Sequence, residues 1–463
     1  MKIERESACV TEERTESLTA DEKPAGRRAA GADVPAPAKR AEPRLYRVIW
    51  RWHFYAGLIV LPVLITAAVT GGLYVFREEL ERVLYPHLMF VEPQPHTVSY
   101  DEQLATATAA MPAGATVHGV SISDDPTRAT VIISETKPER YLFVFVNQHT
   151  GAVLGQLEYD TGFFGIILNL HRTLLAGTTG RLIVELATSW GIILVVTGLY
   201  LWWPRGPNKV RGVLVPRLRG KSYTIWRDWH TVPGFYFSLL AFLVMGTGLF
   251  FTLLFGRGYQ MAASATKSYP SSYADPPKSA PRAGVSKTTL DEIIALTRQR
   301  QSEKEMYVDF PHTAEDSFKV YAGSYDSPST LSILYIDQYS GAVLDMIRWR
   351  QLSAVAKVQI AAYSIHVGSI YGLPTKILAV VVCVLIVAMS VTGAAMWWVR
   401  RPRGRMGFPA KPARFKPAKW LIAVICLLGA LMPAAGISIL LILLGDWTAR
   451  RWLERNGRTR SMS

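Results

Sequence analysis

The sequence predicts an α-helical integral membrane protein with five spans, an internal duplication and two small α+β modules outside the membrane. Each of five apolar runs is about as long as the ~20 residues that a helix needs to cross a bilayer; they lie at 54–76, 181–203, 230–255, 376–399 and 420–445. The segment from the first run to the second and the segment from the third run to the fourth carry the same residues at the same spacings. A chain of 463 residues is also too long for one ordinary domain, so several units are expected.

The distribution of charge predicts how the spans are oriented. The formal net charge is +15, but basic residues gather in the short loops 206–226 and 403–419, whereas 77–180 holds twelve acidic and six basic residues. Short basic loops stay in the cytoplasm, so the modules are expected on the outer side of the membrane. This placement favours membrane lipid over nucleic acid as the partner. A fifth span would put the basic tail 446–463 outside, against the same rule.

The remaining segments follow from the positions of the spans. The first 43 residues are rich in Ala, Glu, Arg and Pro without an apolar core, so 1–43 is predicted to be a disordered cytoplasmic tail. The first repeat covers 44–205 and holds a module at 97–160. The second covers 227–402 and holds a module at 285–350. Each module is predicted to be a short helix followed by strands.

Four of the nine histidines recur at matched positions in the two repeats. His53 and His230 each lie 17 residues before a Thr-Gly pair, whereas His171 and His366 each lie 26 residues before another. A single histidine on an apolar face is usually a satisfied core residue, because an unsatisfied imidazole is costly near hydrocarbon. Two histidines per repeat at equal spacings instead indicate ligands.

The depths of these histidines favour two metal centres over one. Zinc would gather four ligands in one tetrahedral site, but ~30 Å of hydrocarbon separates the two pairs. Haem b needs axial ligands on opposite faces, an apolar slot and cations for its propionates, without a covalent motif. We therefore predict two bis-histidine haems b. Their irons are expected between His53 and His230 near the cytoplasm and between His171 and His366 near the outside, although crossed pairing is also compatible with the sequence.

Other repeated residues are candidates for the haem surroundings. Gly57 and Gly234 follow the first histidine of each repeat by one helical turn and leave room for a helix or a flat ligand. Arg181 and Lys376 follow the second histidine by ten residues; they either hold the outer propionates or anchor the span ends at the interface. Glu185 is expected to form an ion pair with Arg181, one turn away, or to serve in proton or substrate chemistry.

Two haems at opposite faces would divide the distance that an electron must cross. The sequence has no GxGxxG motif opening a βα unit and no cysteine cluster, so the electrons are expected from a quinol or a separate reductase. The three cysteines lie in the N-terminal tail and in two spans, which argues against a disulfide framework and a CxxCH attachment site.

These motifs resemble the PepSY-associated transmembrane family over about 44–445. The resemblance rests on the span starts "WHFYAG" and "WHTVPG", on the spans beginning "LHRTLLAG" and "IHVGSIYG" and ending in Trp-Trp, and on the turns "VNQHTGAVL" and "IDQYSGAVL". Asn147 stands where the pattern has Asp. Within the family, the chain is similar to ferrioxamine-type siderophore reductases, which implies a location in the bacterial inner membrane with the modules in the periplasm. This similarity implies four histidine ligands, two haems b and reduction of ferric siderophore in the periplasm to release Fe(II).

Three other functions remain open from the sequence. Modules of this type also resemble peptidase inhibitors, so the chain could be a non-enzymatic membrane regulator or sensor. It could instead be a haem-bearing conduit to a different periplasmic acceptor. A transporter is the third possibility, because repeats are common in transporters, but these spans hold few midplane polar residues.

Overall fold

The computed structural model describes residues 44–137, 140–204, 210–281, 284–303, 305–324, 326–408 and 419–460. The predicted tail 1–43 and most of the loop 403–419 lie outside these residues. In the first half the elements are α1 (Arg44–Val75), α2 (Arg77–Leu84), α3 (Pro86–Met89), α4 (Tyr100–Ala110), β1 (Thr116–Ser123), β2 (Thr130–Lys137), β3 (Arg140–Val146), β4 (Val153–Glu158), α5 (Phe163–Thr173) and α6 (Gly177–Trp202).

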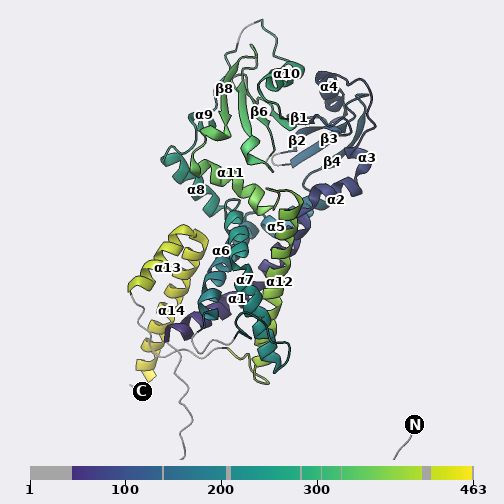
Figure 1. Ribbon diagram of the computed structural model, residues 1–463. Helices are drawn as coiled ribbons and strands as arrows, with labels where there is room; N and C mark the ends of the chain where they lie inside the picture. The colour runs from purple at the N-terminus through teal and green to yellow at the C-terminus, as the bar shows by residue number, and fades with distance from the viewer. Residues whose placement is uncertain are drawn as a thin grey trace, which may run out of the picture. The chain divides into compact units, whose positions relative to one another are not determined.

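The second half follows a similar order of elements (Figure 1). It contains α7 (Ser222–Leu249), α8 (Leu254–Ala265), α9 (Ser271–Ala274), α10 (Leu290–Arg300), β5 (Glu305–Asp309), β6 (Phe318–Ala322), β7 (Ser332–Ile336), β8 (Val343–Arg348), α11 (Ala354–His366) and α12 (Leu373–Arg400). In both halves a long helix, three short helices, four strands, a further short helix and a second long helix follow in turn.

Among the described residues, four helices are long and apolar enough to cross a membrane: α1, α6, α7 and α12. They correspond to the first four predicted spans. Helices α1 and α7 each contact both α6 and α12, so the four form a closed bundle. Helix α1 begins ten residues before the predicted span and α7 eight residues before it, because "RLYRVIWRW" and "SYTIWRDW" continue the helix beyond the apolar core.

The fifth span predicted at 420–445 does not form as one helix. Its residues divide into α13 (Lys419–Leu431) and α14 (Pro433–Arg460), because Pro433 has no N–H to donate and clashes with the preceding turn. The two helices lie side by side (Figure 1), where a Cβ on Gly429 would lie 3.1 Å from Cα of Gly436. Helix α14 extends through most of the predicted tail 446–463.

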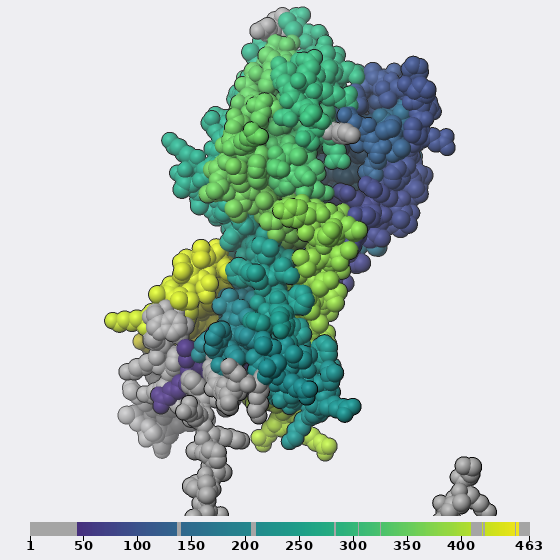
Figure 2. All heavy atoms as spheres, viewed as in Figure 1, coloured from purple at the N-terminus to yellow at the C-terminus, as the bar shows by residue number. Residues whose placement is uncertain are grey.

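The strands of both modules form one antiparallel sheet of eight strands, in the order β4-β3-β2-β1-β5-β6-β7-β8. The two halves meet where β1 pairs with β5, with Val120 opposite Val308. The strands of the two predicted modules are therefore joined in one shared sheet. In the space-filling view of Figure 2, atoms of the first half, in blue, lie beside atoms of the second half, in green. A common hydrophobic core lies between the sheet and helices α4 and α10.

Helices α4 and α10 cap each other across the junction of the two halves. The carboxylate of Asp291 accepts hydrogen bonds from the N–H groups of Tyr100 and Asp101, at 3.0 Å each. The carboxylate of Asp101 in turn accepts bonds from Leu290 at 2.9 Å and Asp291 at 3.3 Å. Each acid thus satisfies N–H groups at the start of the other helix, where a negative charge is favourable.

Candidate functional site

The structure brings the four repeated histidines together as two pairs. His53 of α1 faces His230 of α7 with ring centroids 6.4 Å apart and the rings perpendicular. His171 of α5 faces His366 of α11 with ring centroids 6.1 Å apart and an angle of 50° between the rings. The pairs are the equivalent residues of the two repeats, as the symmetry argument predicted, and not the crossed combinations.

The spacing within each pair matches that of two axial ligands on one iron. Two metal–imidazole bonds of about 2 Å, and roughly 1.2 Å from each ring centroid to its nitrogen, put the centroids about 6.4 Å apart. The observed 6.4 and 6.1 Å agree with this separation. It leaves the rings too far apart for direct stacking contact and too close for a helix to pass between them.

All four imidazoles are oriented through Nδ1. Nδ1 of His53 lies 2.9 Å from Oγ1 of Thr197, and Nδ1 of His230 lies 3.1 Å from the carbonyl of Met389. The second pair uses carbonyl groups of the neighbouring long helix in the same way: Nδ1 of His171 lies 2.9 Å from the carbonyl of Ala67, and Nδ1 of His366 lies 2.9 Å from that of Val244. A bond of this kind fixes the proton on Nδ1 and leaves the lone pair of Nε2 for a metal.

The repeated Thr-Gly pairs form the seats of these histidines, a role that their spacing alone did not reveal. A Cβ on Gly71 would lie 3.0 Å from Cε1 of His171, and one on Gly248 would lie 2.8 Å from Cε1 of His366. The same contact is 3.3 Å from Gly198 to His53 and 3.5 Å from Gly393 to His230. The absent side chain at each glycine therefore lets an imidazole lie directly against the backbone of the next helix.

The two pairs lie at different levels of the bundle. On α1, His53 belongs to the first pair, and Gly71 contacts His171 of the second pair. His53 and Gly71 are 18 residues apart. At 1.5 Å per residue these two sites are about 27 Å apart along the helix, comparable to the thickness of the hydrocarbon core. His230 and Gly248 give the same separation on α7. This geometry excludes one four-histidine zinc site.

A cavity of about 630 Å³ lies at the first pair, within the ~300–1,000 Å³ typical of ligand sites. His53 and His230 line it together with the apolar side chains of all four long helices. Gly57 and Gly234, predicted as haem surroundings, also lie in its wall; Sδ of Met389 would be 3.3 Å from a Cβ on Gly234. The cavity is therefore mostly apolar and opens beside the paired imidazoles.

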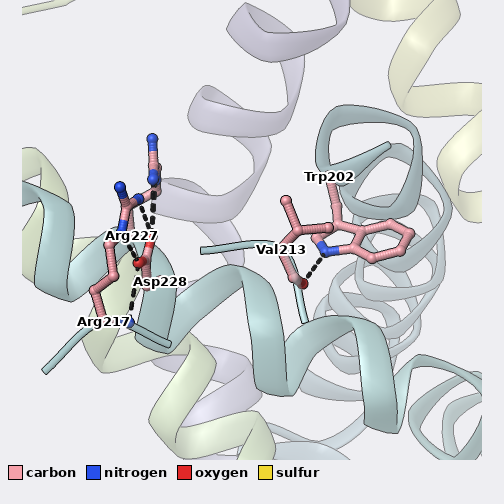
Figure 3. A network of polar contacts seen from close by, with 5 residues as sticks. All are labelled: Trp202, Val213, Arg217, Arg227 and Asp228. Atoms are coloured by element: carbon pink, nitrogen blue, oxygen red, sulfur yellow. Dashed lines mark hydrogen bonds and ion pairs between the residues drawn. The ribbon is translucent and has the colours of Figure 1, made fainter. Parts of the chain in front are cut away.

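Arginines line the same cavity near the loop between α6 and α7 (Figure 3). Arg217 and Arg227 both bind Asp228, at 2.6 and 2.8 Å, and the Asp228 side chain is fully buried. One carboxylate between two guanidinium groups leaves a net positive charge beside the cavity. Sequence reasoning missed this group, although the acid in "RDWH", directly before Trp229 and His230, was a visible signal. Trp202 lies nearby and donates to the carbonyl of Val213 at 2.9 Å.

The cations predicted for the second pair have protein partners. Lys376 forms a 2.8 Å ion pair with Glu79, and Arg181 donates to the carbonyl of Phe251 at 3.0 Å. A role in holding propionates remains a prediction for both. Glu185 does not pair with Arg181 as expected. Its buried carboxylate accepts from the N–H groups of Leu254 and Phe255, at 2.8 and 2.9 Å, at the start of α8.

Comparison with known proteins gives a family for the chain. The model of the PepSY-associated TM region matches residues 50–400, which include most of α1, the other three long helices, the sheet and all four paired histidines. A comparison with curated proteins finds no match. Because the family model covers well over half of the sequence, the chain belongs to the PepSY-associated TM region family and is a multi-pass membrane protein.

Proposed function

We propose that the protein is a transmembrane electron carrier with two haems b that reduces ferric siderophore and so releases Fe(II). The observation that carries the proposal is the pair of facing imidazoles at each of two levels, spaced as two axial ligands of one iron. His53 and His230 would hold one iron, and His171 and His366 the other. When bound, haem iron supplies one-electron chemistry between its ferric and ferrous states.

The residues around the pairs support haem more than a structural role. Each imidazole presents Nε2 while Nδ1 is occupied by the adjacent helix, which is the tautomer that a metal ligand needs. At the first pair, the apolar walls exclude water, and the positive charge of Arg217 and Arg227 suits two propionates. A membrane regulator would not require two such pairs.

The orientation that we propose follows from charge. The basic loop between α6 and α7 would lie in the cytoplasm, which puts the first pair near that face and the sheet in the periplasm. The hairpin of α13 and α14 supports this orientation, because it returns the basic tail to the same side as the basic loop before α13. The conflict that a single fifth span created is thereby removed.

Reduction is a chemically sufficient way to release iron from a siderophore. Hydroxamates and related oxygen donors bind hard Fe(III) more tightly than Fe(II), so one added electron weakens the chelate. The protein then has to bring the chelate close to the second pair, where His171 and His366 would remain bound to the haem iron. The shared sheet would serve as the docking surface or as a cover that limits access of water to the second pair. Electrons would come from a quinol or a separate reductase.

A mixing experiment tests the choice of acceptor. Purified protein is reduced with dithionite, freed of excess reductant and mixed anaerobically with ferrioxamine, while the haem α-band and a ferrous chelator are monitored. We expect loss of the reduced α-band in step with formation of the coloured Fe(II) complex. If the α-band is unchanged with ferrioxamine but another periplasmic acceptor oxidises the haem rapidly, the protein is an electron conduit to that acceptor. A colourless protein would support a regulator or sensor.

A further inference from the structure

A cluster outside the paired histidines has the composition of a metal site. It consists of His118 in β1, Asp309 at the end of β5 and His312 in the following loop. One ligand atom from each residue lies within 4.8 Å of the others. We propose that these three side chains bind one divalent first-row transition metal ion. This inference does not depend on the haem proposal.

The distances describe an open set of ligands that needs only side-chain rotation to close. Nε2 of His118 lies 4.0 Å from Oδ1 of Asp309, and the rings of His118 and His312 have centroids 5.4 Å apart. Neighbouring ligand atoms on a bound ion lie about 3 Å apart, given bonds of about 2.1 Å. His312 is exposed in the loop after β5, so its ring has room to make this approach.

Two polar atoms of the cluster are buried without a partner. Nδ1 of His118 and Oδ1 of Asp309 have no hydrogen bond within the part of the chain that the structure describes. A carboxylate oxygen removed from water without a donor is costly, and a cation would offset the cost. Both side chains nevertheless keep 28% of their surface accessible, so an ion can enter.

The sheet itself directs these groups toward one another. The register of β1 against β2 shifts between Val117 and Gly119, so His118 is the extra residue of a bulge, a feature that often re-aims a side chain. Gly119 pairs with Asp309 across the junction of the two halves. A Cβ at Gly119 would overlap the hydroxyl of Tyr307, so glycine is needed for this close packing beside the carboxylate.

Lys319 is the main alternative partner of Asp309, since it is opposite Asp309 in the pairing of β5 with β6. Its ammonium lies 5.0 Å from the ring centroid of Tyr321 and 5.4 Å from that of Tyr273, in cation–π geometry. The lysine is therefore held over aromatic rings and leaves Oδ1 of Asp309 without a hydrogen bond. Two imidazoles and one carboxylate suit Fe(II), Co(II), Ni(II) or Zn(II), whereas Mg(II) and Ca(II) prefer oxygen ligands.

Equilibrium dialysis of the full-length, haem-supplemented protein with Co(II) tests the site, after treatment with EDTA and with bound cobalt counted by atomic emission. We expect the tightest cobalt site to be weakened at least about tenfold in His118→Ala, Asp309→Asn and His312→Ala. Millimolar Mg(II) should not displace the ion. The matched control is His87→Ala, which removes an exposed histidine outside the cluster and should leave cobalt binding unchanged.

Two results would overturn the inference: equal cobalt binding in the wild-type protein and Asp309→Asn, or displacement of the ion by Mg(II). Cobalt held at the paired histidines of α1, α5, α7 and α11 would be the same in all four variants, so the comparison separates it from the proposed site. Asp309→Asn preserves the size of the side chain, and His312→Ala changes an exposed loop position. Loss of binding in these two variants, with thermal unfolding unchanged, cannot be attributed to misfolding.

Discussion

Replacement of Gly248 by alanine should loosen haem binding selectively at the second of the two proposed sites. A Cβ at this position would lie 2.8 Å from Cε1 of His366, about 0.7 Å inside the ~3.5 Å of an ordinary carbon contact. The imidazole must therefore tilt or its helix must shift, and overpacking of this size costs about 1–3 kcal/mol. At 1.4 kcal/mol per factor of ten, haem retention at this pair should weaken roughly 5- to 150-fold.

The four Thr-Gly seats supply matched controls for this prediction. Gly393→Ala makes the same chemical change, but its Cβ would lie 3.5 Å from His230, an ordinary contact, so haem retention at the first pair should be nearly normal. Gly71→Ala and Gly198→Ala, at 3.0 and 3.3 Å, should give intermediate effects in that order. Alanine is also the better helix former by about 1 kcal/mol, so weakening of the long helix cannot explain a loss.

The assay is the rate of haem transfer from the purified variant to excess apomyoglobin, followed by absorbance and resolved into two phases. We predict one accelerated phase in Gly248→Ala and two nearly unchanged phases in Gly393→Ala. Unchanged phases in Gly248→Ala, or a larger effect in Gly393→Ala, would refute the reasoning that these glycines seat the haem ligands.

Three further predictions follow from individual hydrogen bonds. Thr197→Val removes the Nδ1 partner of His53 and should weaken haem retention at the first pair by about 10- to 100-fold. Thr70→Val should have a smaller effect, because Nδ1 of His171 keeps the carbonyl of Ala67 as its partner. The rate of haem transfer distinguishes the two variants. Asp101→Ala removes the cap of α10 and should cost about 1 kcal/mol in thermal unfolding; an unchanged midpoint would contradict the reciprocal caps. Burial alone would raise the pKa of Asp337, but N–H donors outweigh it and lower the pKa to about 2. Because this pKa is depressed from about 3.9, the carboxylate contributes about 2–3 kcal/mol above pH 4, which is lost as the pH falls through 2. Asp337→Asn should remove that part of the pH dependence of thermal unfolding.

The sequence was most informative where the two repeats could be compared. Matched spacing selected four of nine histidines and predicted their partners, and the structure places those partners opposite each other, with ring centroids 6.4 and 6.1 Å apart. Hydropathy likewise located the four long helices. These features depend on residues close together in the chain or on the comparison of one repeat with the other.

Contacts between distant elements could not be predicted in the same way. The Thr-Gly pairs were visible as a repeat, but which histidine each one seats depends on how the long helices pack. The continuous sheet depends on the pairing of β1 with β5, and neither strand indicates its neighbour across the junction. The fifth run was uniformly apolar, so its hydropathy concealed the break at Pro433. Asp228 was visible as an acid next to the basic loop 206–226, but its position between Arg217 and Arg227 depends on how that loop folds back against α7.

The most direct test of the central claim is the number of haems per chain in the wild-type protein and in four variants, each with one of the paired histidines replaced by alanine. We predict two haems b in the wild-type protein. Replacement of His53 or His230 should remove one of these haems, and replacement of His171 or His366 should remove the other, so that the absorption spectra of the variants form two matching pairs. A wild-type protein without haem, or single variants that keep both haems, would contradict the account.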